Sequence, residues 1–195
     1  MKIGLSLSPG GLLLPYHLGA LDALQYRRVL DESTPIAGSS AGAIAVASHG
    51  CGIDSKRVLQ MTFDICDTCR ELGGARGRLL KLLREKLDQT IGPQELETLQ
   101  QRPGQVGVAY KEIFPQNRSV LQTKFEDNED LLNAVCHSSA FPFFSTNWPF
   151  VLDRSSRGPR LVVDGFFTVD RDRFGCPDFE QADVEVDRTL MISVF

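Results

Sequence analysis

Two short apolar segments in this chain each end in a glycine-rich turn that leads into a helix-compatible run. Residues 2–8 alternate apolar and polar side chains, as a strand does, and then meet the turn at 9–11. Apolar side chains recur at helical spacing over 16–30. A second strand is predicted over 34–37, and it runs into the turn at 38–42. This alternation of strand, turn and helix favours an α/β sheet with helices on both faces.

The remainder of the chain carries further helix and strand patterns. They predict helices that begin near 54 and 128, an amphipathic helix over 79–87, a hairpin of 106–110 and 119–123, a strand over 161–163 and a last buried strand over 189–194. We find no internal repeat and no long linker. We therefore expect a single domain over residues 1–195.

Composition excludes several classes of protein. The chain has 21 Lys and Arg against 25 Asp and Glu, a net charge of -4, so no overall positive field is available to hold nucleic acid. No apolar run approaches the roughly 18–20 residues that cross a bilayer, and the N-terminus lacks the apolar stretch of a signal peptide. The 5 cysteines, an odd number, favour a reducing compartment. We expect a cytoplasmic protein that contacts membranes, if at all, from their surface.

Residues 76–88 combine a leucine stripe with several Lys and Arg side chains. Such a helix can lie on an anionic lipid surface, where each basic side chain adds about 1 kcal/mol. It can equally cover a protein core, with its leucines inward and its charges in solvent. The second arrangement is the commoner one, and the sequence alone leaves both open.

The turn Gly38-Ser39-Ser40-Ala41-Gly42 has the spacing G-x-S-x-G. At a strand-to-helix elbow this spacing projects the central hydroxyl, here that of Ser40, while the glycines let neighbouring backbone pass close to it. The N–H of Ala41 would then point toward the same atom from the start of the helix. An ordinary small-residue turn is the competing interpretation, but the apolar strand before it favours a nucleophile.

A nucleophilic serine needs a base, and the histidines do not supply one in the usual order. The chain has only His17, His49 and His137, and none follows a late acid as the order Ser, Asp, His would require. A Ser-Asp dyad remains possible, in which a carboxylate takes the serine proton directly. Asp164 ends an apolar strand, at the rim where α/β sheets place catalytic groups. An ordinary turn aspartate is the alternative.

The first glycine turn offers a second chemical element. Backbone N–H groups at Gly10 and Gly11 can approach a developing oxyanion closely, because glycine carries no side chain to block them. Pro9 has no N–H and cannot donate. A plain turn is the competing interpretation.

Together these segments resemble the patatin-like phospholipase domain, with the adipose triglyceride lipase class as the closest type. The resemblance covers nearly the whole chain: Ser8-Pro9-Gly10-Gly11, residues 16–20, 38–42, 128–142, 164–165 and 189–194. It implies a three-layer α/β/α sandwich around a mainly parallel central sheet.

The resemblance also implies roles for individual residues. Ser40 would be the nucleophile and Asp164 the general base; Gly10, Gly11 and Ala41 the oxyanion donors; and Gly38, Gly42 and Gly165 the motif glycines. The implied activity is hydrolysis of lipid acyl esters through an acyl-enzyme, without metal or organic cofactor. The implied substrate is a phospholipid, galactolipid or acylglycerol at a membrane or lipid droplet surface.

Three positions depart from the family pattern, and they motivate an alternative function. Pro9 and Leu14 stand where the family usually has glycines, and Phe166 follows Asp164-Gly165 where it usually has a small residue. The alternative is a patatin-like protein of low hydrolytic activity that binds lipid or transfers acyl groups. The chain ends soon after its last predicted strand, so we also expect a C-terminal extension found in the family to be missing.

Two weaker patterns receive structural interpretations. Cys66 and Cys69 are spaced C-x-x-C without a second pair or a suitably placed histidine, which predicts two helix cysteines rather than a zinc site. The aromatic cluster over 141–150 is predicted to form core or cleft wall, and part of it to line a groove for an acyl chain.

Overall fold

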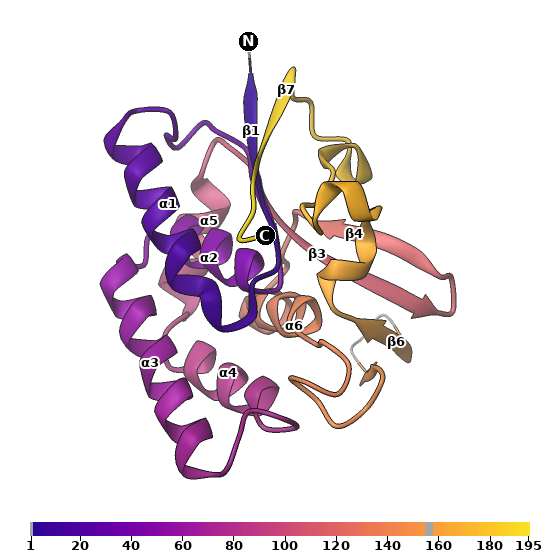
Figure 1. Ribbon diagram of the computed structural model, residues 1–195. Coiled ribbons are helices and arrows are strands. Elements are labelled where there is room, and N and C mark those ends of the chain that lie inside the picture. The colour runs from indigo at the N-terminus through magenta and orange to yellow at the C-terminus, as the bar shows by residue number, and fades with distance from the viewer. Residues whose placement is uncertain (1, 155–157) are drawn as a thin grey trace.

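The computed structural model describes residues 2–154 and 158–195 (Figure 1). Its helices are α1 (Leu14–Tyr26), α2 (Ala41–Gly50), α3 (Ser55–Glu71), α4 (Leu79–Asp88), α5 (Pro93–Gln101) and α6 (Asn128–Ser138). Its strands are β1 (Ile3–Leu7), β2 (Ile36–Ser39), β3 (Val106–Phe114), β4 (Arg118–Gln122), β5 (Val151–Asp153), β6 (Arg160–Val163) and β7 (Arg188–Ile192). Short 3₁₀ helices are η1 (Gly11–Leu13), η2 (Gly165–Thr168), η3 (Arg171–Arg173) and η4 (Phe179–Ala182).

All these strands form one sheet in the order β5-β6-β3-β2-β1-β7, with β4 also paired to β3. The consecutive strands β7, β1, β2 and β3 are mutually parallel, which confirms the predicted parallel centre. The strands β4, β5 and β6 are antiparallel additions beside β3. The β3–β4 hairpin is the predicted one.

Strands β2 and β6 pair with the same edge of β3, one after the other. Along one edge, β2 pairs with Val106 to Ala109, and β6 pairs with Lys111 to Phe114. The opposite edge is occupied over Val108 to Glu112 by β4, so β2 and β6 share an edge. Because β2 runs parallel to β3 and β6 antiparallel, the carboxyl ends of β2 and β6 meet on either side of Tyr110.

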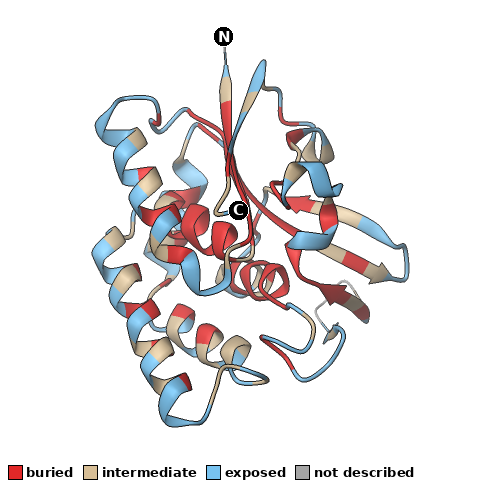
Figure 2. Ribbon diagram, in the orientation of Figure 1, coloured by how far each residue is buried: buried red, intermediate tan, exposed pale blue. Residues whose placement is uncertain are grey.

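The two faces of the sheet carry side chains of different size. Large side chains of the central strands, such as Leu5 and Val108, join the main core beneath the α-helices, whereas Ala37 and Ala109 face Phe179 in a smaller cluster. Figures 1 and 2 show the α-helices gathered on one face, with the most buried segments in the sheet, α2 and α6. The mixed α/β class is confirmed, and the second face is covered by short 3₁₀ helices because its small side chains admit a thin layer.

Several boundaries differ from the prediction. Helix α1 ends at Tyr26 rather than at residue 30, because the chain reverses through Arg28 at a φ of 58°. The last strand is an edge strand with Leu190 and Met191 exposed, not a buried one. Helix α5 and strand β5 were not predicted. Each is short, and α5 is preceded by the capping residue Gly92, whose N–H donates to the Glu95 carboxylate at 2.9 Å.

Helix α4 is the basic leucine helix of the sequence. Its Leu83 and Leu87 are buried in the core. Arg84 forms ion pairs with Asp88 and Glu129, and the Lys86 ammonium lies 2.8 Å from the Asp64 carboxylate. This arrangement supports the core-covering interpretation, because these cations are already paired within the protein.

Candidate functional site

Ser40 occupies a strained elbow between β2 and α2. Its φ is 52°, in a region that costs a residue with a side chain roughly 1–3 kcal/mol. The Ser40 N–H donates to the Ser138 Oγ at 2.8 Å, and the Ser40 carbonyl accepts the Ile44 N–H at 3.0 Å. These contacts from α6 and α2 hold the elbow in place. The sequence missed Ser138, because a lone hydroxyl at a helix end gives no periodic signal.

The motif glycines lie where the backbones of neighbouring elements are in contact. A Cβ added to Gly38 would lie 2.3 Å from the Gly42 carbonyl, and one added to Gly42 would lie 2.6 Å from the Leu7 carbonyl oxygen. A Cβ on Gly165 would lie 2.4 Å from the Ala109 carbonyl oxygen. These positions therefore accept only glycine without a backbone shift, and they let β1, β2, α2 and η2 pack directly around the elbow.

Asp164 follows β6 and faces the same point of the sheet. It is 0% exposed, its Oδ1 accepts the Phe166 N–H at 2.9 Å, and its own N–H donates to the Ala140 carbonyl at 3.2 Å. We expected it at the rim where α/β sheets place catalytic groups. The strand before it, β6, is antiparallel to β3, and the Asp164 side chain lies near Ser40 because β6 meets β2 end to end along β3.

Burial raises the pKa of Asp164 to about 7, and the Phe166 N–H and the Ser40 hydroxyl act in the opposite direction. Among the described residues, no donor has the distance and angle of a hydrogen bond to the Asp164 Oδ2. The Ser40 hydroxyl nevertheless lies near enough to stabilise the charged form of Asp164. A carboxyl group with this pKa gains and loses its proton near neutral pH. It has the property that a general base requires.

The glycine loop lies beside Ser40, as predicted. Gly10, Gly11, Ser40 and Ala41 line one cavity, and a Cβ added to Gly10 would lie 3.6 Å from that of Ala41. Gly11 has a φ of 54°. The first N–H groups of α2 have no intrahelical acceptor, so those near Ala41 are free to bind an anion. Pro9 and Leu14 belong to the same wall.

The cavity beside Ser40 has a volume of about 460 Å³ and mostly apolar walls. Its other lining residues are Leu12, Ile44, Met61, Thr62, Ile65, Leu79, Leu80, Leu83, Ser139, Phe141, Phe144, Ser145, Phe166 and Phe195. The wall from α3 and α4 was not predicted, because the apolar stripes of those helices are typical of any core-covering helix.

Part of the predicted aromatic cluster forms this wall. Phe141 and Phe144 line the cavity, and the Phe141 ring contacts Phe166 and Phe167. Phe166, one of the departures from the family pattern, is therefore part of an aromatic group at the cavity. Trp148 lies in a different cleft.

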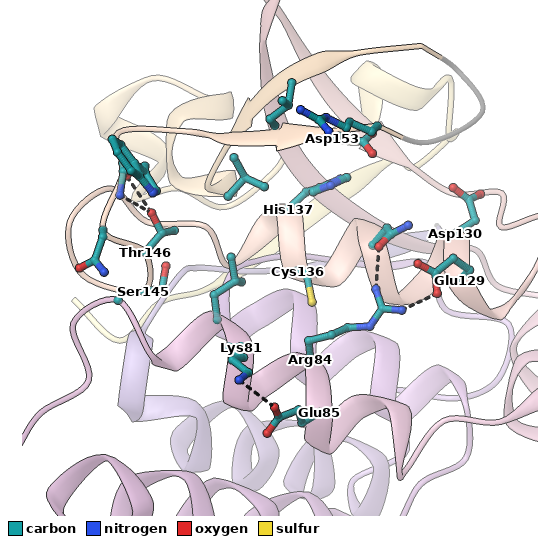
Figure 3. Close-up of a pocket in the computed structure, with 18 of the residues that line it drawn as sticks. Lys81, Arg84, Glu85, Glu129, Asp130, Cys136, His137, Ser145, Thr146 and Asp153 are labelled. Carbon is teal, nitrogen blue, oxygen red and sulfur yellow. Dashed lines mark hydrogen bonds and ion pairs between the residues drawn. The ribbon is translucent and has the colours of Figure 1, made fainter. Parts of the chain in front are cut away.

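That second cleft is larger, about 790 Å³, and lies between α4, α6 and β5 (Figure 3). It is more polar than the Ser40 cavity: Figure 3 shows Arg84 bonded to Glu129, and His137 beneath the strand that carries Asp153. Arg84 also donates to the Asn133 side-chain oxygen. Ser40 does not line it, whereas Ser40 does line the smaller, apolar cavity. We therefore place the candidate chemistry in the smaller cavity.

Two of the three histidines, His17 and His137, are packed in the interior. His17 and His137 are buried, burial lowers the pKa of His17, and burial lowers the pKa of His137 to about 4. The His137 ring packs edge-on against Tyr110. Neither ring lines the Ser40 cavity.

The described part of the chain holds neither a cluster of metal-ligating side chains nor a helix that could span a membrane. Within residues 2–154 and 158–195, no three His, Cys, Asp or Glu side chains converge as metal ligands would. No helix in those ranges is both long enough and apolar enough to traverse a bilayer.

Comparison with known proteins identifies the family. The model of the patatin-like phospholipase family matches residues 5–170, which include the elbow, the glycine loop and Asp164. The chain belongs to the patatin-like phospholipase family.

A human relative, patatin-like phospholipase domain-containing protein 5, is 27% identical over 189 residues, covering 89% of this chain and 40% of that protein. The crystal structure of VipD from Legionella pneumophila superposes with a TM-score of 0.58 at 15% identity, covering 98% of this chain and 49% of that one. The patatin-like chain thus spans less than half the length of either.

The glycine contacts predict a clear contrast between two substitutions. Gly42→Ala should destabilise the protein by more than about 2 kcal/mol, because its Cβ meets backbone of β1 that cannot move aside. Gly19→Ala, on an exposed turn of α1 with nothing within 4 Å, should stabilise it by about 0.5–1 kcal/mol. Urea unfolding monitored by circular dichroism measures both. A Gly42→Ala protein as stable as wild type would contradict the close approach of α2 and β1.

Proposed function

We propose that this patatin-like domain hydrolyses acyl esters of lipids, with Ser40 and Asp164 as its catalytic dyad. The observation that carries the proposal is the meeting of a strained serine and a buried carboxyl group of near-neutral pKa at two abutting strand ends, beside an apolar cavity. Family membership supports lipid acyl hydrolysis in general. The assignment of the two residues is our own.

In the first step the Ser40 Oγ attacks the ester carbonyl carbon, and its proton passes to the Asp164 carboxylate. The carbonyl oxygen becomes an oxyanion. We assign the stabilisation of this charge to the backbone N–H groups of Gly10, Gly11 and Ala41, residues that line the same cavity as Ser40. When the carbon–oxygen bond to the alcohol breaks, Asp164 returns the proton to the leaving alcohol, and the acyl group stays on Ser40.

In the second step water replaces the alcohol. Asp164 takes one proton from water, the water oxygen bonds to the acyl carbon, and the bond to the Ser40 Oγ breaks as the proton returns to Ser40. The fatty acid leaves. Because one carboxyl group accepts and releases the proton in both steps, a pKa of about 7 suits it to both roles.

The walls of the cavity favour a lipid acyl group over a small polar ester. Leucine, isoleucine, methionine and phenylalanine side chains from α2, α3, α4 and the segment after α6 surround the space. Burying an acyl chain there gains about 0.8 kcal/mol for each methylene group. Phospholipids, galactolipids and acylglycerols share the ester, and we propose the class without choosing among them.

Exposed apolar side chains outside the cavity suggest how a water-insoluble substrate arrives. We define the apolar rim as Leu12, Leu13, Tyr16, Phe143 and Phe144, which all have exposed side chains. Leu12 and Phe144 also line the cavity, so the rim adjoins its mouth. We propose that the rim docks on a membrane or lipid droplet surface. We assign this docking to apolar contact. Of the α4 cations, Arg84 and Lys86 are paired with carboxylates, whereas the Lys81 side chain is 82% exposed.

The dyad makes a specific prediction for two variants. A fluorophosphonate should label wild-type protein once, as a single adduct in the intact mass, and fail to label Ser40→Ala. Asp164→Asn should label at least about 100-fold more slowly, because the amide accepts no proton. Acyl hydrolysis should follow the same order.

The stability of Asp164→Asn shows whether its slower labelling results from the missing base or from misfolding. The pKa of Asp164 is raised on folding, so ionising it costs stability as pH rises from about 4 to about 7. Asp164→Asn should therefore be no less stable than wild type at pH 8. Equal labelling of wild type and Ser40→Ala would overturn the assignment, whereas a folded wild type that binds lipid but takes no label would favour the lipid-binding alternative.

The apolar rim predicts a separation between soluble and aggregated substrates. In Leu13→Asp/Phe143→Asp, two side chains that are 55% and 52% exposed become charged. Hydrolysis of long-chain lipid in vesicles should fall at least about 10-fold, while hydrolysis of a soluble short-chain ester stays within about twofold of wild type. Tyr26→Asp, at an 85% exposed position at the end of α1, is the control and should change neither rate. Unchanged vesicle hydrolysis in the rim variant would exclude this docking surface.

A further inference from the structure

The Ser139 hydroxyl, directly after α6, differs from the neighbouring serine hydroxyls in its hydrogen bonding. The Ser138 Oγ accepts the Ser40 N–H, and the Ser145 Oγ donates to the Ser139 carbonyl at 2.6 Å. The Ser139 Oγ is buried, yet within residues 2–154 and 158–195 it has no hydrogen-bond partner. Buried polar atoms in native proteins are nearly always paired. This hydroxyl is therefore a candidate for binding something that is not part of the chain.

Ser139 lines the same cavity as Ser40, and its two neighbours in the chain, Ser138 and Ala140, bond to the backbone of Ser40 and Asp164. The carbonyl of Ala140 accepts the Asp164 N–H at 3.2 Å. The segment that carries the unpartnered hydroxyl is thus fastened to the proposed base. Asp164 holds a second buried atom without a hydrogen bond in the described residues, its Oδ2.

These two groups complement each other chemically. An ionised carboxylate only accepts hydrogen bonds, whereas a serine hydroxyl can donate one. A molecule that donates a proton to Asp164 and accepts a hydrogen bond from Ser139 satisfies both. Water and the hydroxyl group of an alcohol are the simplest molecules of this kind.

The fold also argues against an oxyanion at Ser139. Ser139 caps the carboxyl end of α6, where the helix dipole and the free carbonyl groups disfavour negative charge. The favourable site for an anion is the amino end of α2, near Ala41 and the glycine loop. The surroundings of Ser139 and of Ala41 therefore differ in electrostatic character.

We propose that Ser139 binds the hydroxyl of the acyl acceptor, the molecule that removes the acyl group from Ser40. The inference rests on the proposed dyad. The acceptor O–H gives its proton to the Asp164 carboxylate, its oxygen bonds to the acyl carbon, and the bond from that carbon to the Ser40 Oγ breaks as Asp164 protonates Ser40. The Ser139 hydroxyl donates to the second lone pair of the acceptor oxygen. Water yields a free acid, and a glycerol-type alcohol yields a new ester.

The test separates acylation from deacylation with p-nitrophenyl butanoate, a soluble ester. In Ser139→Ala, kcat should fall about 10-fold, kcat/KM should stay within about twofold, and the acyl-enzyme should accumulate in the intact mass. Ser139→Cys, which keeps the side-chain volume but donates weakly, should behave like Ser139→Ala. Thr98→Ala, on exposed α5, removes a hydroxyl far from the site and should match wild type.

Added glycerol distinguishes the two acceptors. If Ser139→Ala forms both glyceryl butanoate and butanoic acid more slowly than wild type, alcohol and water share the subsite. If only one product forms more slowly, the subsite belongs to the acceptor that yields that product. A parallel fall in kcat and kcat/KM, or no change in either, would overturn the role of Ser139 while leaving the dyad intact. A wild-type protein that never becomes acylated at Ser40 would overturn the dyad and this inference with it.

Discussion

The site depends on one strand, β3, which pairs along a single edge with the ends of two others. Strand β2 delivers Ser40 from the parallel side, and β6 delivers Asp164 from the antiparallel side. Tyr110 lies between the two pairing regions, and its ring packs against His137 of α6. The hydrogen bonds of a sheet fix this geometry more firmly than contacts between loops could, so that two residues far apart in sequence face each other without a connecting element.

The rest of the site packs closely around the point where β2 and β6 meet. Glycines at 38, 42 and 165 allow backbone to approach backbone, so the elbow is bounded by main chain rather than by side chains that could rotate away. The same close packing excludes water from Asp164 and raises its pKa to about 7. Close packing therefore accounts both for the fixed elbow and for the raised pKa of Asp164, and the apolar cavity lies beside Ser40.

How far the sequence predicted this site can be seen in three residues. Ser40 was found because its neighbours carry a local signature, a strand, two glycines and a helix. Asp164 was singled out by its place after an apolar strand, but an ordinary turn aspartate remained the alternative, and the family resemblance alone gave it the role of base. Nothing local in residues 161–165 states which strand β6 will meet or in which direction. Ser139 was not singled out. Its interest comes from a missing hydrogen bond, which only packing in three dimensions creates, and the cavity wall from α3 and α4 was hidden for the same reason.

The account depends most directly on Asp164 acting as a base toward Ser40, and the pH dependence of Ser40 labelling tests that. The rate of reaction with an uncharged fluorophosphonate should rise with pH through about 7 and fall about 100-fold by pH 5, where about 1% of a carboxyl with that pKa is ionised. Asp164→Asn should abolish this transition. A rate that is independent of pH between 5 and 8, or a transition that persists in Asp164→Asn, would contradict the dyad.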